Sequence, residues 1–178
     1  MAYPLLTERL EIEPLGHAGV AEFVAYRQDP AVARWQSWEA DYGEAQAREL
    51  VRGQPSGPLP GRGEWLQLGV HDRGSGQLLG DVAVHALADQ PDTYEIGVTF
   101  ARTAQGQGRA TEAVRRVLQL LFDAGAHRVI ATCDARNVPV ARLLQRVGMR
   151  QESSQVEADW FKGEWTTLDA YAVLARER

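Results

Sequence analysis

The stretch Gln105–Ala110, Gln-Gly-Gln-Gly-Arg-Ala, constrains the fold more than any other part of the chain. Its two glycines let the backbone come close to a ligand, and a helix-forming run, Thr111–Ala126, follows directly. Backbone N–H groups and the positive end of the helix dipole therefore converge on one point. The sequence predicts an anion site here, and we expect the anion to be a pyrophosphate.

Two nucleotide-binding patterns and a plain helix cap compete as interpretations of Gly106-x-Gly108. A dinucleotide fingerprint needs a third glycine where Thr111 stands, and it needs a strand that opens the unit at its N-terminus. A nucleoside-triphosphate loop needs Gly-Lys-Ser/Thr, whereas Arg109 and Ala110 follow the second glycine. The plain helix cap stays open when the loop is considered alone.

The spacing of apolar residues predicts strands and helices around this loop. Short apolar or alternating runs predict strands at Leu5–Leu15, Glu64–His71, Gln77–Leu87, Tyr94–Phe100, Arg128–Cys133, Arg150–Asp159 and Trp165–Leu174. Helical spacing or composition predicts helices at His17–Arg27, Asp41–Gly53, Ala110–Ala124 and Val138–Val147. Pro30–Trp38 is interpreted as a connection, and the Pro- and Gly-rich Gln54–Gly63 as a surface loop.

These elements predict an α/β domain over residues 1–178. Short connections join the three strands that precede the glycine loop, which favours an antiparallel meander. The strand–helix–strand passage that follows predicts a parallel pair inside an otherwise antiparallel sheet.

Composition argues against several classes of function. The net charge is −5 and Lys162 is the single lysine, so we expect no nucleic-acid partner. No apolar run is long enough for a membrane span and Met1–Arg9 has no signal-peptide pattern, so we expect a cytoplasmic protein without a membrane partner. No metal is expected, because Cys133 has no metal-ligand spacing with the four histidines, His17, His71, His85 and His127.

Four linked features around the loop, in a fixed order, resemble a known family. They are the strand Tyr94–Phe100, the helix start Gln105-x-x-Gly108-x-Ala110, the run Ala-Thr-Glu-Ala-Val114, and, after a further strand, Asn137 followed by Leu143-Leu-Gln-Arg-Val-Gly-Met149. This order is similar to the GNAT superfamily of acetyl-CoA dependent N-acetyltransferases. The amino-acid sequences of Leu5–Leu10 and Gly108–Ala113 resemble those of one branch of the superfamily. That branch contains ribosomal-protein N-terminal acetyltransferases and many small-molecule acetyltransferases.

The resemblance implies a mostly antiparallel sheet of about seven strands and about four helices, with the parallel pair splayed at the cofactor site. It also implies acetyl-CoA as co-substrate, with its pyrophosphate on the loop residues Gln105, Gly106, Gln107, Gly108, Arg109 and Ala110. The pantetheine arm would meet the backbone of Val98 and Phe100, and the cofactor would pass Asn137 and Arg142.

Acetyl transfer to an amine needs a group that takes a proton, a polarised carbonyl and a proton for the leaving thiolate. Glu95 is the expected base by resemblance; the alternative is a solvated strand residue. By the same resemblance, a backbone N–H at a bulge near Gly97 and Val98 would polarise the thioester carbonyl. Relatives carry a hydroxyl as proton donor where this chain has Leu144 or Val140.

Cys133 lacks a histidine spaced to activate it, and we expect a buried core thiol rather than a nucleophile.

The resemblance implies an acceptor wall in the region of Trp35 and Trp38, and His85 is a further candidate for the acceptor site, with ordinary core packing as the alternative for each. The expected acceptor is a small-molecule amine or a protein N-terminus. A non-catalytic acyl-CoA binding or sensor module is the alternative function, since both donor hydroxyls are missing. The tail strand Leu168–Leu174 could pair across a homodimer.

Overall fold

A computed structural model describes residues 3–177 of the chain, so Met1 and Ala2 of the segment Met1–Arg9 lie outside the described residues. Eight strands form one sheet in the order β1-β2-β3-β4-β5-β6-β8-β7. Their bounds are β1 Leu5–Leu6, β2 Leu10–Pro14, β3 Trp65–Asp72, β4 Leu78–Ala86, β5 Thr93–Phe100, β6 Arg128–Asp134, β7 Arg150–Phe161 and β8 Glu164–Leu174. The α-helices are α1 Val20–Arg27, α2 Pro30–Ala33, α3 Glu44–Arg52, α4 Arg109–Asp123 and α5 Val138–Arg146. Single 3₁₀ turns lie at His17–Gly19, Arg102–Ala104 and Ala175–Glu177.

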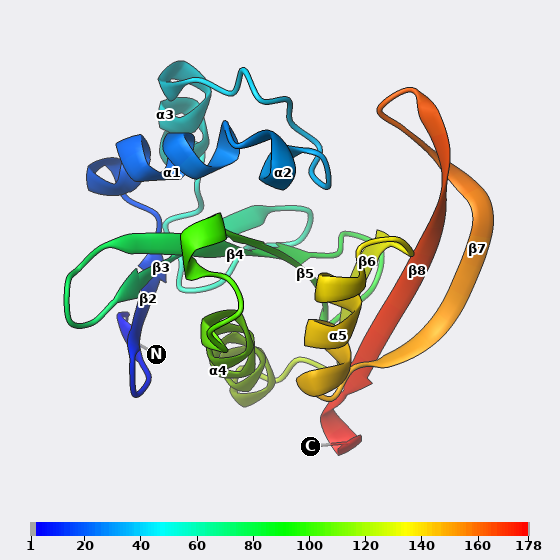
Figure 1. The fold of residues 1–178 in the computed structure, drawn as a ribbon. Coiled ribbons are helices and arrows are strands. Elements are labelled where there is room, and N and C mark those ends of the chain that lie inside the picture. The colour runs from blue at the N-terminus through cyan, green and yellow to red at the C-terminus, as the bar shows by residue number, and fades with distance from the viewer. Residues whose placement is uncertain (1–2, 178) are drawn as a thin grey trace.

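The sheet separates two groups of helices (Figure 1). Helices α1, α2 and α3 lie over one face, and α4 and α5 lie over the other. The long hairpin of β7 and β8 arches away from the sheet toward α2. The main core fills the face covered by α4, where Val82, Val84 and Ile96 pack against Val117 and Leu121.

The predicted mixed sheet is confirmed, with β5 and β6 as its parallel pair. This pairing is short, because only Thr93–Glu95 of β5 register with Arg128–Ile130 of β6. Beyond Glu95 the two strands part, while β5 stays paired with β4 on its other side as far as Phe100. One backbone edge of β5 is therefore left open in the middle of the sheet.

Helix α4 forms where the apolar spacing predicts it. It begins after Gly108, whose φ of 77° is a left-handed conformation that favours glycine, and its buried stripe includes Ala113, Val117 and Leu121. The chain then turns at Gly125, whose φ is 96°. The turn fixes where α4 ends.

Several segments differ from the sequence prediction. The first predicted strand is two strands, β1 and β2, and the connection after Pro30 contains α2, which Asp29 caps by accepting the Ala31 N–H at 2.9 Å. The expected bulge at Gly97 and Val98 is absent, because every residue of β5 from Tyr94 to Phe100 has one partner in β4.

The expected dimer contact through the tail strands ending in Leu168–Leu174 stays a prediction, but β8 itself cannot carry it. Strand β8 is paired on both sides, with β6 and with β7, and so has no free edge. Within residues 3–177, no helix combines the length and apolar character that crossing a membrane needs. In the same range, no group of three or more His, Cys, Asp or Glu side chains is placed to hold a metal ion.

A close approach of β4 to β5 gives a test of this sheet. A Cβ at Gly80 would lie 2.3 Å from the Thr99 carbonyl oxygen and 2.8 Å from Cα of Phe100. We expect Gly80→Ala to lower the free energy of unfolding by about 1–3 kcal/mol, measured by urea denaturation, because backbone must move to admit the methyl group. Gly97→Ala is the matched control, since its Cβ would meet only the Ala83 methyl group, at 3.6 Å. Equal unfolding midpoints for Gly80→Ala and the wild type would contradict the close approach.

Candidate active site

The open edge of β5 presents backbone carbonyls to side-chain amides instead of to a strand. The Val98 carbonyl accepts a hydrogen bond from Nε2 of Gln36 at 3.4 Å. The Phe100 carbonyl accepts one from Nε2 of Gln105 at 2.9 Å. Both carbonyls therefore point into the gap between β5 and β6, where an extended amide-bearing ligand could reach them.

The glycine loop lies at the end of this open edge. Gly106 and Gly108 have φ angles of 75° and 77°, so both glycines use the conformation that the sequence predicts for them. No side chain caps the N-terminus of α4. Its first backbone N–H groups are thus directed at the space in front of the helix, which suits an anion.

A cavity of about 530 Å³, the loop pocket, joins the loop to the open edge. All the predicted cofactor-binding residues line it except Gln107, whose side-chain amide instead donates to the Thr103 carbonyl at 2.8 Å. Its lining comprises Ala31, Val32, Trp35, Gln36, Val98, Thr99, Phe100, Ala104, Gln105, Gly106, Gly108, Arg109, Ala110, Thr111, Asn137, Pro139, Val140, Arg142, Leu143 and Arg146.

The two predicted arginines differ in their surroundings. Arg109 is ion-paired with Asp72, with 3.1 Å between Nη2 and Oδ2, so part of its charge is already balanced. Arg142 is exposed on α5 at the rim of the loop pocket.

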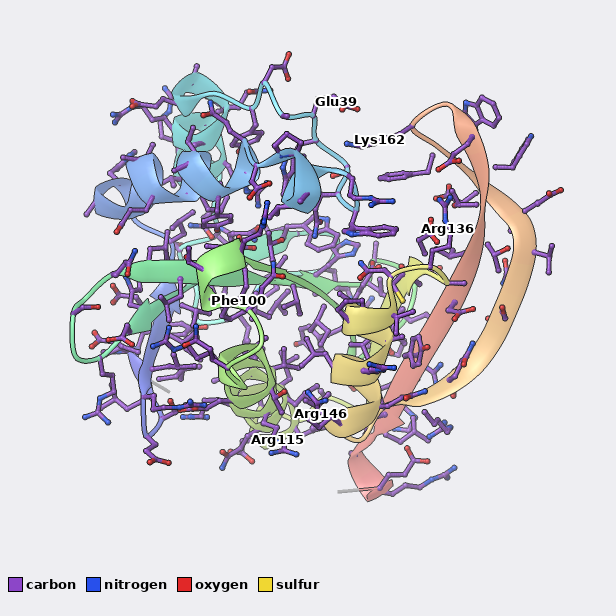
Figure 2. All side chains as sticks on the ribbon, in the orientation of Figure 1. Glu39, Phe100, Arg115, Arg136, Arg146 and Lys162 are labelled. Atoms are coloured by element: carbon purple, nitrogen blue, oxygen red, sulfur yellow. The ribbon has the colours of Figure 1, made fainter. Side chains whose placement is uncertain are left out.

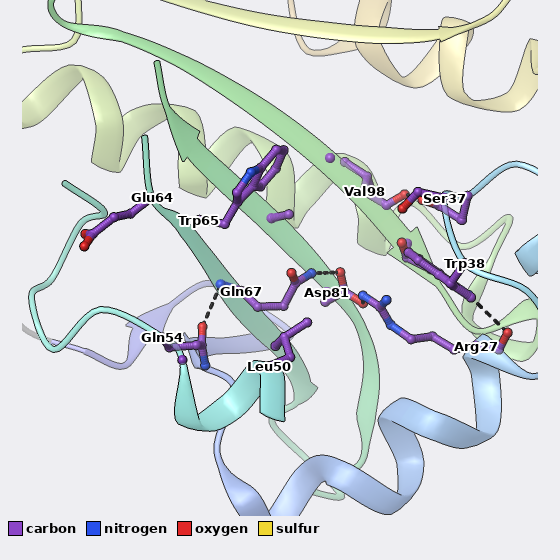
Figure 3. Close-up of a pocket in the computed structure, with 15 residues that line it drawn as sticks. Arg27, Ser37, Trp38, Leu50, Gln54, Glu64, Trp65, Gln67, Asp81 and Val98 are labelled. Carbon is purple, nitrogen blue, oxygen red and sulfur yellow. Dashed lines mark hydrogen bonds and ion pairs between the residues drawn. The ribbon is translucent and has the colours of Figure 1, made fainter. Parts of the chain in front are cut away.

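A second cavity, the sheet pocket, lies on the α1 side of β5 (Figure 3) and measures about 540 Å³. Its lining comprises Arg27, Gln36, Ser37, Trp38, Leu50, Gly53, Gln54, Glu64, Trp65, Gln67, Asp81, Ala83, Gly97, Val98 and Thr99. Gln36, Val98 and Thr99 line both cavities, so the two pockets meet at β5.

The predicted acceptor residues are divided between different places. Trp38 lines the sheet pocket, whereas Trp35 lines the loop pocket, so the two side chains border different cavities and their role at the acceptor stays a prediction. His85 lines neither pocket.

His85 instead belongs to a row of three cross-strand neighbours, Trp65, His85 and Glu95, on the sheet-pocket face. The Trp65 and His85 rings are stacked, with 4.4 Å between centroids. Nδ1 of His85 lies 3.6 Å from Oε2 of Glu95 and is buried without a hydrogen-bond partner. Glu95 itself does not line the sheet pocket, but Trp65 in its own row and Gly97 in the next row both do.

A buried charged cluster at the floor of the sheet pocket was missed from the sequence. The Asp81 carboxylate accepts hydrogen bonds from the Tyr26 hydroxyl and the Gln67 amide, and Arg27 lies 3.8 Å away. Burial raises the pKa of Asp81, and the Arg27 guanidinium opposes that rise. The available signal was a lone aspartate inside the apolar run Leu78–Ala86.

The C-terminal hairpin holds the segment that carries Trp38 (Figure 2). Nζ of Lys162, in the turn between β7 and β8, donates to the Ala33 carbonyl at 2.9 Å and to the Trp38 carbonyl at 2.6 Å. It also forms an ion pair with Glu39 at 3.2 Å. One side chain thereby joins the tail to the wall of the sheet pocket.

The two positions where relatives carry a hydroxyl have different environments. Val140 lines the loop pocket, whereas Leu144 is buried in the core and lines neither cavity. The hydroxyl side chains among the lining residues are those of Ser37, Thr99 and Thr111.

The family model of the acetyltransferase (GNAT) domain matches residues 9–150, and the chain belongs to this family, as the order of features around the loop predicts. It is 37% identical over 86 residues to the uncharacterized N-acetyltransferase YnaD of Bacillus subtilis strain 168, which covers 48% of this chain and 51% of YnaD. The chain thus spans about half the length of that relative.

Solved structures share the fold over almost the whole chain. A GNAT-family acetyltransferase from Bacillus anthracis superposes with a TM-score of 0.85 at 26% identity, covering 97% of this chain and 99% of that one. RimL, a ribosomal L7/L12 alpha-N-protein acetyltransferase in complex with coenzyme A, gives 0.81 at 17% identity, over 94% and 95% of the two chains. The latter likeness shows the common fold.

The environment of Cys133 predicts an unreactive thiol. Burial, with Asp169 and Asp134 nearby, raises its pKa to about 11. At pH 8 roughly one thiol in a thousand is then ionised, against about a quarter for an unperturbed cysteine. We expect a disulfide reagent to label the native protein at least about 100-fold more slowly than the urea-unfolded protein at that pH.

Because the chain has one cysteine, the signal reports Cys133 alone, and the urea-unfolded sample is the control. Native labelling as fast as that of a free thiol would contradict the buried-thiol assignment.

Proposed function

We propose that this protein is an N-acetyltransferase that moves the acetyl group of acetyl-CoA directly to a primary amine in a ternary complex. The observation that carries the proposal is the meeting of the two pockets at Val98 and Thr99 of β5. One cavity suits the donor and the other the acceptor. The reacting groups would meet where β5 parts from β6.

The loop pocket fits coenzyme A in the groups that it offers. The uncapped N-terminus of α4 and the glycine loop would receive the pyrophosphate. The Val98 and Phe100 carbonyls already accept hydrogen bonds from side-chain amides, which is the kind of donor that the pantetheine arm carries. Acetyl-CoA, when bound, supplies an activated acetyl thioester.

The sheet-pocket face suits an acceptor that arrives as an ammonium ion and must lose a proton before it attacks the thioester. In our proposal Glu95 accepts that proton through water, because it stands one row from Gly97 on the same face. His85, 3.6 Å from its carboxylate, would orient it. Since neither Val140 nor Leu144 has a hydroxyl, solvent would protonate the departing thiolate.

The remaining expectations stay proposals. They are a single domain over residues 1–178, a cytoplasmic location, and partners limited to acetyl-CoA and an amine acceptor, with neither nucleic acid nor a membrane. The net charge of −5 supports the absence of a nucleic-acid partner. A homodimer also stays a proposal; of the two strands that end the order, β1 has two residues and β7 has 12, so β7 would be the strand that pairs with a second copy.

A non-catalytic acyl-CoA binding module is the second candidate, because Val140 lines the loop pocket where a donor hydroxyl is expected. Release of free thiol from acetyl-CoA with a broad amine panel separates the two candidates. We expect turnover well above hydrolysis for at least one amine among polyamines, aminoglycosides, amino acids, amino-acid amides and short peptides. Tight binding of coenzyme A by calorimetry without turnover for any amine would favour the binding module.

The role of Glu95 predicts a change in the pH profile. Near pH 7 a primary amine is mostly an ammonium ion, so Glu95→Gln should lower kcat/KM by about 100-fold or more. Near pH 10 the free amine is abundant, and the variant should approach the wild type. Glu22→Gln, on the exposed side of α1, is the matched control and should leave the profile unchanged. Parallel pH profiles for Glu95→Gln and the wild type would remove Glu95 as the base.

A further inference from the structure

The sheet pocket contains a buried cation whose hydrogen-bonding groups are poorly matched by the protein. Arg27, at the end of α1, is 4% exposed and lines the cavity. Its nearest anionic neighbour is Asp81, with 3.8 Å between Nη2 and Oδ1, which exceeds a hydrogen-bond distance. The guanidinium also interacts with the Tyr26 hydroxyl, but Nε of Arg27 is buried without a hydrogen-bond partner among residues 3–177. A guanidinium carries five N–H donors, and leaving them unmatched in a buried site costs free energy.

Aromatic rings hold this guanidinium in place without satisfying its donors. It lies 3.9 Å from the centre of the Phe23 ring and 3.6 Å from that of the Trp38 ring. The Trp38 indole N–H donates to the Arg27 carbonyl at 3.2 Å, which fixes the ring over the guanidinium. Figure 3 shows the Arg27 side chain reaching below Trp38 toward Asp81. The charge is thus fixed in position.

The other polar side chains of the pocket floor are already matched. Asp81 accepts from Tyr26 at one carboxylate oxygen and from Gln67 at the other. The Gln54 side chain donates to the Leu15 carbonyl at 2.7 Å and accepts the Gln67 backbone N–H at 2.7 Å. Of the charged groups on the floor, Arg27 is therefore the one with unused hydrogen-bonding capacity.

We propose that Arg27 binds a carboxylate of the acceptor, so that the substrate is a small amino acid-like zwitterion rather than a polyamine. Its carboxylate would accept hydrogen bonds from the guanidinium at the floor of the sheet pocket. Its amine would lie toward Gly97 and Val98, where the two pockets meet. Trp38 and Trp65 would supply apolar surface for the side chain, in a cavity of about 540 Å³.

The arrangement of charge favours an anion over a second cation at the floor. A polyamine would need an anion with free acceptor capacity, and Asp81 is 1% exposed and is already bonded by two donors and paired with Arg27. Glu64, the other carboxylate of the lining, is exposed and points away from Arg27 and Asp81 (Figure 3), so it supplies no anion at the floor. A guanidinium matches a carboxylate with two parallel hydrogen bonds, so a carboxylate would satisfy donors that Asp81 leaves unmatched.

The inference rests on the proposed transfer to an amine, and matched substrates test it. Each of several α-amino acids is compared with its amide and with the amine that lacks the carboxylate, by thiol release from acetyl-CoA. We expect kcat/KM for at least one acid to exceed that of its amide by about tenfold or more, because the amide lacks the charge that the guanidinium binds.

Two variants locate this preference at Arg27. Arg27→Met combined with Asp81→Asn removes both buried charges together, so neither is left unpaired. The acid-to-amide ratio should fall to about one in the double variant, while coenzyme A affinity by calorimetry stays at the wild-type value. Arg27→Lys keeps the charge but loses the planar pair of donors, and should retain an intermediate ratio.

The outcomes separate this inference from the function on which it rests. Turnover of amides or polyamines as fast as of the acids, or an unchanged ratio in the double variant, would overturn the role of Arg27 while the acetyltransferase function stands. Coenzyme A binding without turnover of any amine would overturn the function itself.

Discussion

The site depends on one interruption of backbone pairing, the parting of β5 from β6 after Glu95. A strand in the middle of a sheet normally has both edges bonded, and unpaired backbone groups must find other partners. Here the Val98 and Phe100 carbonyls accept hydrogen bonds from the side-chain amides of Gln36 and Gln105. Such bonds can be exchanged for a ligand without breaking the sheet, because β4 still holds the other edge of β5. Both pockets and the glycine loop are arranged around this gap.

The parts that the sequence predicted well have local causes. Gly106 and Gly108 need positive φ angles at one helix start, and the apolar spacing of the following fifteen-residue helix α4 defines its buried stripe. The order of strands and helices after Tyr94 then led to the family. The residues that line the loop pocket come mainly from this contiguous part of the chain, which is why every predicted cofactor residue except Gln107 is found among them.

The floor of the sheet pocket could not be predicted in the same way. Arg27, Gln67 and Asp81 come from α1, β3 and β4, and their contacts depend on the register of the sheet and on how α1 crosses it. No local pattern encodes that geometry. Trp35 and Trp38 show the same limit. They are close together in the sequence, yet they line different cavities. The resemblance pointed to aromatic residues near an acceptor, but not to the cavity that each would line.

The contact of Lys162 with the Ala33 and Trp38 carbonyls has a consequence for the order of assembly. These partners are separated by more than a hundred residues, so the wall that carries Trp38 is secured only after the C-terminal hairpin exists. Synthesis proceeds from the N-terminus, and the glycine loop and α4 therefore leave the ribosome before Lys162 can make these contacts. Because the braced segment contributes residues to both cavities, a nascent chain would complete neither pocket until the polypeptide is nearly finished.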